Sequence, residues 1–187
     1  MFIDLTLTIT PQLRTDAAGN EKKTLTGHLG THFDVMKQSF PLAYLERKAI
    51  VFDVSAVKDR EIEAEDIDLK KVSEDMFVAF YTGFIEKEGY ATERYFKEHP
   101  VLSLALIKTL VAQQISIIGI DFAGVRRGAE HTPTDQFCAE RGVFIVENLC
   151  QLKALLKDQK DASFIANTYP VKYEGMTGLP CRVVAKV

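Results

Sequence analysis

Short apolar runs, each about as long as a β-strand, recur along the chain and are separated by polar or helix-like segments. Four of them are rich in β-branched and aromatic residues, which favour strands: residues 49–54, 76–81, 115–121 and 143–147. After Pro100, Leu102, Leu106 and Leu110 recur every four residues and predict an amphipathic helix. Strands interleaved with helices indicate an α/β fold. A length of 187 residues, of which 47% are hydrophobic, suits a single domain over residues 1–187.

Weaker patterns complete the expected order of elements. They are a strand over 2–10 that stops at Pro11, a polar loop over 12–27, a short solvated helix over 61–68, a loop over 122–134, a helix over 135–141 that ends before Gly142, a helix over 149–156 and a last strand over 182–185. No repeat, low-complexity tract or linker interrupts this order. The composition therefore gives no reason to divide the chain.

The segment from His28 to Asp34 holds three side chains that could bind a metal within seven residues. If it is extended, successive side chains alternate faces, and His28, His32 and Asp34 lie on the same face. Gly30, between the two imidazoles, leaves room for an ion and permits unusual backbone angles. Two imidazoles and a carboxylate suit zinc, manganese, iron or cobalt.

Two further carboxylates stand directly after apolar strands. Asp121 follows the run over 115–120, and Glu147 follows Val143 to Val146. In α/β folds, polar groups just beyond strand ends often line the ligand pocket. A carboxylate in that place either caps the next element or belongs to a site, and the pattern leaves both alternatives open.

Charge and cysteine content argue against several classes of partner. The net charge is −3 and no long Lys/Arg run occurs, so we expect no nucleic-acid partner. No apolar stretch approaches the roughly 20 residues that span a bilayer, and the N-terminus lacks the pattern of a signal peptide. The three cysteines form no Cys-x-x-Cys pair, which favours reduced thiols. We expect a cytoplasmic protein that does not associate with a membrane.

The segment over 28–34 resembles the signature of the cyclase family of metal-dependent hydrolases, which includes bacterial kynurenine formamidase and isatin hydrolase. The family pattern reads His-x-Gly-Thr-His-x-Asp-x-Pro-x-His. This chain supplies five of the seven fixed positions, namely His28, Gly30, Thr31, His32 and Asp34. Similarity extends along most of the chain, through residues 3–6, 81–83, 118–121 and 142–149.

The resemblance implies a swivelling β/β/α fold and a centre of one or two divalent ions, most simply zinc or manganese. It also implies a homodimer or higher homo-oligomer. The family places a metal-binding Glu where this chain has Glu147. It carries a metal-binding His where this chain has Asp135, twelve residues before Glu147.

Two departures from the family pattern bear on the chemistry. The family's proton-transferring His is replaced by Gln38, whose amide cannot act as a general acid or base, so Gln38 is only a substrate-binding candidate. Asp135 changes the charge of the metal site, and His131, four residues earlier, could supply the lost imidazole or be an ordinary surface histidine. Glu147 and His131 are the candidates for proton transfer.

These residues predict a metal-dependent hydrolase of a small amide, lactam or related carbonyl compound, in which the ion activates a water molecule. Arg126 and Arg127 could bind an acidic substrate, or they could be solvated loop residues. One alternative is a non-catalytic metal- or ligand-binding member of the same fold, suggested by Gln38. Another is a metal-assisted isomerase or lyase, which needs no water nucleophile.

Overall fold

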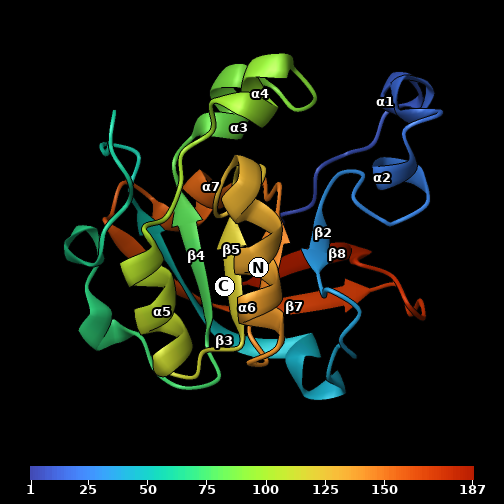
Figure 1. Ribbon diagram of the computed structural model, residues 1–187. Helices are drawn as coiled ribbons and strands as arrows, with labels where there is room; N and C mark the ends of the chain where they lie inside the picture. The colour runs from blue at the N-terminus through green and yellow to red at the C-terminus, as the bar shows by residue number, and fades with distance from the viewer.

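The computed structural model describes residues 1–187 and contains one β-sheet that closes on itself (Figure 1). The strand order is β1-β8-β2-β6-β5-β4-β3-β7, and a further pairing of β7 with β8 joins the two ends into a barrel-like ring of seven strands, with β1 beside β8. The strands are β1 Phe2–Asp4, β2 His32–Asp34, β3 Glu46–Asp53, β4 Phe77–Tyr81, β5 Ile117–Ile120, β6 Phe144–Glu147, β7 Asp161–Pro170 and β8 Gly178–Lys186.

Short helices surround this sheet. The α-helices are α1 Pro11–Ala17, α2 Glu21–Thr24, α3 Phe84–Glu88, α4 Glu93–Lys97, α5 Leu104–Ala112, α6 His131–Ala139 and α7 Leu152–Leu156, and the 3-10 helices are η1 Leu42–Leu45, η2 Ala64–Asp66, η3 Leu69–Lys71 and η4 Gly128–Glu130. Figure 1 shows α5 and α6 in front of β4 and β5, with α1–α2 and α3–α4 beyond the upper end of the sheet. No helix has the length and apolar character needed to cross a membrane.

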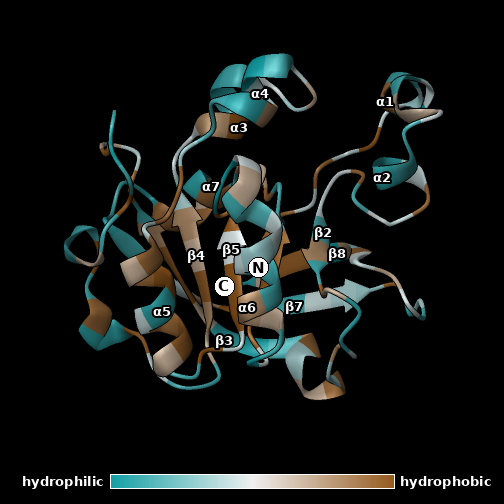
Figure 2. Ribbon diagram, viewed as in Figure 1, coloured by the Kyte–Doolittle hydropathy of each residue, from teal (hydrophilic) through white to brown (hydrophobic).

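Alternate residues of the central strands face two different cores. In β4, Phe77 and Ala79 join side chains from the other strands of the ring inside the closed sheet, whereas Val78 and Phe80 pack with the leucines of α5. Burial on both faces explains why these strands read as continuous apolar runs rather than as alternating ones. Figure 2 shows the same contrast, with hydrophobic strands behind helices that carry mixed polarity.

The strand directions bring the sequence-predicted acids to one end of the molecule. Strands β3, β4, β5 and β6 run parallel, so their carboxyl ends share one edge of the sheet. Strand β2 runs antiparallel to β6, and its register sets His32 directly opposite Glu147. Two segments that are distant in the sequence therefore meet at the carboxyl end of β6.

The strands predicted from apolar runs are confirmed as β3, β4, β5, β6 and β8, and the prediction of an α/β domain is confirmed. Three local predictions were wrong. The first strand covers only Phe2–Asp4, the expected loop over 12–27 contains α1 and α2, and residues 131–134 belong to α6 rather than to a loop. Strand β7 was not predicted, because its buried positions include the small or polar residues Ala166 and Thr168.

Gly119 in β5 provides a test of this packing. A Cβ atom there would lie 2.7 Å from the Phe77 ring and 2.8 Å from Leu149. We predict that Gly119→Val lowers the free energy of unfolding by about 1–3 kcal/mol through overpacking. Denaturant unfolding measures this change. Ser163→Val, at an exposed position of β7, is the matched control. Equal stability of the two variants would contradict the described core.

Candidate metal centre

The first three candidate ligands converge, although their segment is not extended throughout. Only His32–Asp34 form a strand, and His28 lies in a turn with positive φ angles at Gly27 (83°) and Gly30 (72°). The prediction of one extended face was therefore wrong for residues 28–31. The turn nevertheless brings His28 Nε2 to 3.2 Å from Asp34 Oδ1, and His32 Nε2 lies 3.6 Å from the same oxygen.

Helix α6 and strand β6 add three more side chains to this group. His131 and Asp135 are one helical turn apart, with His131 Nε2 3.2 Å from Asp135 Oδ2. Glu147 lies between the two sets, with Oε2 3.6 Å from His32 Nε2 and Oε1 3.9 Å from His131 Nε2. The structure thus unites six sequence-predicted residues, which we call the six-residue cluster: His28, His32, Asp34, His131, Asp135 and Glu147.

All three imidazoles of the cluster are oriented by backbone carbonyls. The Nδ1 atoms of His28, His32 and His131 lie 3.1, 2.8 and 3.1 Å from the carbonyl oxygens of Lys22, Gly30 and Arg126. Because a carbonyl only accepts hydrogen bonds, each Nδ1 must carry the proton and donate it. In the neutral imidazoles each Nε2 then faces the carboxylates with a free lone pair, which is the arrangement that a metal ion requires.

Asn148 and Gly124 support this arrangement, and the sequence analysis missed both. Asn148 has a φ of 61°, and its Nδ2 donates to Gly30 O at 2.9 Å, the carbonyl that also accepts from His32. Gly124 (φ 106°) leaves space for the His131 imidazole, because a Cβ atom at residue 124 would collide with its Nδ1. An Asn after the strand-end acid and a loop glycine were the available signals, and neither is specific.

The three carboxylates of the cluster are almost fully buried, with exposures of 2% for Asp34, 2% for Asp135 and 5% for Glu147. Burial and the charge of Asp34 raise the pKa of Asp135 to about 9, and the same causes raise the pKa of Glu147. Burial also disfavours ionisation of Asp34, but when the imidazoles of His28 and His32 are protonated at Nε2, their hydrogen bonds and charge outweigh burial and lower the pKa of Asp34. The carboxylates therefore repel one another unless a positive charge lies among them.

Four buried polar atoms in this cluster have no hydrogen-bond partner: His32 Nε2, Asp34 Oδ2, Asp135 Oδ1 and Glu147 Oε1. Unpaired buried polar atoms are costly and rare in folded proteins. Four of the eight such atoms in the protein lie in this cluster, and each of the four is a possible metal-ligand atom. The donor set therefore fits a divalent cation.

Asp34 belongs to two overlapping groups of ligand atoms that could each hold an ion. One group is His28, His32 and Asp34; the other is Asp34, His131 and Asp135, and the ligand atoms within each lie within 4.8 Å of one another. A carboxylate has two oxygens and can serve two ions. The geometry accommodates one ion or two.

The remaining site candidates lie outside the cluster. Gln38 is exposed and lines a cavity of about 880 Å³ between segments 37–45 and 170–179. The Arg126 guanidinium is bound by Glu61, Glu130 and Leu102 O at 2.6–3.0 Å, so few of its donors face solvent. Arg127 is exposed and donates to Lys97 O at 3.3 Å.

Asp121 serves as a cap rather than as a member of the cluster. Its carboxylate accepts hydrogen bonds from Thr82 N, Thr82 Oγ1 and Gly83 N at 2.6–3.1 Å, at the start of α3. The sequence left open whether each strand-end acid caps the next element or belongs to a site. In the structure Asp121 is a cap, and Glu147 belongs to the six-residue cluster.

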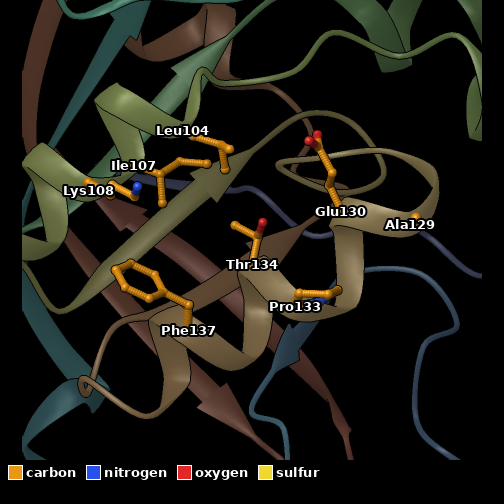
Figure 3. A pocket seen from close by; sticks show the side chains of 8 residues that line it. All are labelled: Leu104, Ile107, Lys108, Ala129, Glu130, Pro133, Thr134 and Phe137. Carbon is orange, nitrogen blue, oxygen red and sulfur yellow. The ribbon is translucent and has the colours of Figure 1, made fainter.

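A separate pocket of about 280 Å³ lies between α5 and α6 (Figure 3). Figure 3 shows Thr134 and Phe137 of α6 on the side of Leu104 and Ile107 of α5. No cluster residue lines this pocket, because His131 and Asp135 occupy a different face of α6. It contributes nothing to the metal centre.

The chain is similar in sequence and in fold to known proteins. The Cyclase family model matches residues 3–126. A structure described as a potential metal-dependent hydrolase with cyclase activity is similar at 26% identity and a TM-score of 0.76, covering 99% of this chain and 96% of the other. A comparison with curated proteins found no match.

Isatin hydrolases share the fold at lower identity. Isatin hydrolase A from Labrenzia aggregata, bound to benzyl benzoate, has 19% identity and a TM-score of 0.76, covering 99% of this chain and 93% of the other. An isatin hydrolase bound to the product analogue thioisatinate has 19% identity and a TM-score of 0.74, covering 100% of this chain and 92% of the other. These similarities confirm the predicted cyclase-like fold.

Glu147→Gln tests whether this residue belongs to the metal centre. The substitution keeps the size of the side chain and removes its charge. We predict that it weakens affinity for a divalent ion by about 10-fold or more, as measured by titration of the metal-free protein. Glu140→Gln, on the exposed end of α6, is the matched control. Unchanged affinity of Glu147→Gln for the divalent ion would show that Glu147 lies near the centre without contributing to metal binding.

Proposed function

Because the chain belongs to the Cyclase family, we propose that it is a metal-dependent hydrolase of a small amide, lactam or related carbonyl compound. The observation that carries this proposal is the convergence of three imidazole Nε2 atoms on three buried carboxylates with unpaired oxygens. The description of a similar structure as a metal-dependent hydrolase supports it.

In this proposal His28, His32 and Asp34 would hold a divalent ion, and Asp135, beside Asp34, would complete the site, while His131 stays free for proton transfer. Mixed nitrogen and oxygen donors suit zinc or manganese. A divalent ion there would supply Lewis acidity, which would activate water at about neutral pH and polarise a carbonyl group.

Proton transfer is assigned to Glu147 and His131, because the position of the family's proton-transferring His is taken by Gln38. Glu147 Oε1 has no hydrogen-bond partner and lies 3.9 Å from His131 Nε2, so one water molecule could join the two. The His131 side chain is 20% exposed, whereas that of Glu147 is 6% exposed. His131 is therefore the member of the pair that exchanges protons with solvent.

Substrate binding is assigned to the candidates whose polar groups remain accessible. Arg127 keeps an exposed guanidinium that could bind an acidic group by a charge-assisted hydrogen bond. Gln38 offers an amide to the cavity over 37–45 and 170–179. Arg126 is left out, because its guanidinium is bound within the protein.

We further propose a homodimer or higher homo-oligomer in the cytoplasm. Large apolar side chains are exposed beside the cavity that contains Gln38, with 83% of Leu42 and 53% of Tyr173 accessible. Exposed apolar groups of this size commonly mark association surfaces. The three cysteines are unpaired, which suits a reducing compartment.

The second candidate function is metal-dependent ligand binding without catalysis. It is favoured by one observation, the loss of the family's proton-transferring His at Gln38. In that case the metal centre would bind a carbonyl compound without turning it over.

Hydrolysis by metal-loaded protein tests the proposal. A panel of small amides and lactams should contain at least one compound that is cleaved, and Asp34→Asn should abolish the cleavage. N-formylkynurenine should be hydrolysed about 10²- to 10⁴-fold more slowly than by a family member with the proton-transferring His, since general acid–base catalysis contributes that much.

Two outcomes would change this conclusion. Absence of turnover across the panel, with metal bound, would favour the ligand-binding function. Hydrolysis of N-formylkynurenine at a rate comparable to that of a His-bearing member would show that Glu147 and His131 replace the missing histidine fully, and the predicted deficit would be wrong.

A further inference from the structure

Tyr90 lies outside the six-residue cluster, yet its hydroxyl group meets the metal-binding segment. It stands in the turn between α3 and α4, and its Oη accepts a hydrogen bond from Gly30 N at 2.9 Å. Gly30 O in turn accepts the Nδ1 proton of His32. The Tyr90 hydroxyl is therefore fixed against the residue that separates two imidazoles of the cluster.

The hydroxyl hydrogen of Tyr90 has no acceptor within the protein. The two buried tyrosines use theirs: Tyr95 donates to Asn148 Oδ1 at 2.7 Å, and Tyr81 donates to Glu86 Oε2 at 3.0 Å. Tyr90 is half-buried, and burial together with the charge of Glu147 raises its pKa. The hydroxyl thus keeps its proton at neutral pH and has a hydrogen-bond donor to offer.

Aromatic packing holds the Tyr90 ring in place. Its centroid lies 5.6 Å from that of Tyr95 and 5.7 Å from that of Phe96, both in edge-to-face contact. The ammonium of Lys23, on α2, lies 4.8 Å from the Phe96 ring centroid. Helices α2 and α4 are thereby linked at the end of the sheet where Figure 1 shows both pairs of helices. A donor mounted in this way loses little entropy when it binds a ligand.

We propose that Tyr90 donates a hydrogen bond to an oxygen of the ligand held at the candidate metal centre. The proposal rests on the proposed function, in so far as it requires a metal ion there. The ligand would carry a carboxylate or carbonyl oxygen that faces the segment over 28–32. A fixed donor beside a buried charge cluster acts in a low-dielectric setting, where such a bond is strong.

Acetate binding to cobalt-loaded protein tests the proposal. Elemental analysis first measures the metal content of wild type, Tyr90→Phe and the control Tyr169→Phe, which loses an exposed hydroxyl. Visible absorption then follows acetate titration of each protein. We expect full metal content in all three and an acetate dissociation constant raised about 10-fold or more in Tyr90→Phe alone, the usual worth of a hydrogen bond to a charged acceptor.

Each other outcome has a definite meaning. Unchanged acetate affinity in metal-loaded Tyr90→Phe would overturn the donor role. Loss of metal in that variant would also overturn it, because Tyr90 would then act only by supporting Gly30. Absence of metal from wild type would refute the proposed function together with this inference. Metal and acetate binding without any amide or lactam turnover would contradict the hydrolase function alone.

Discussion

The antiparallel pairing of β2 with β6 is the contact on which the candidate centre depends. It sets His32 opposite Glu147 and so joins the segment over 28–34 to the parallel half of the sheet. Helix α6 precedes β6 and packs on the same strands, which brings His131 and Asp135 to the same end. A slip of one residue in the β2–β6 register would turn His32 and Asp34 to the opposite face of the sheet.

The buried negative charge of the six-residue cluster is not neutralised by any arginine or lysine of the protein. Three buried carboxylates lie together, and no arginine or lysine contacts Asp34, Asp135 or Glu147. Backbone carbonyls fix the imidazoles so that their Nε2 lone pairs also point inward. Both the carboxylates and the imidazoles thus present electron pairs to the same space. A divalent cation is the ligand that relieves this arrangement, and metal binding should contribute to folding stability.

Much of this arrangement follows from short-range sequence patterns, and the rest depends on tertiary contacts. The buried strands and Glu147 at the end of β6 were predictable, because continuous apolar runs need burial and their last polar residue marks the edge of the sheet. The turn that positions His28 could not be predicted from the sequence, since it depends on the close approach of Gly27 to Gly178 O. The ion pair between Arg126 and Glu61 could not be predicted either, because the two residues are distant in the sequence.

The most direct test of this account is an anomalous difference map from crystals of the protein loaded with zinc. The account predicts a peak among the six residues, about 2.0–2.2 Å from at least two imidazole Nε2 atoms and from Asp34. A second peak near Asp135 would indicate two ions. A map with no peak among these residues, from crystals whose zinc is bound elsewhere, would contradict the central claim.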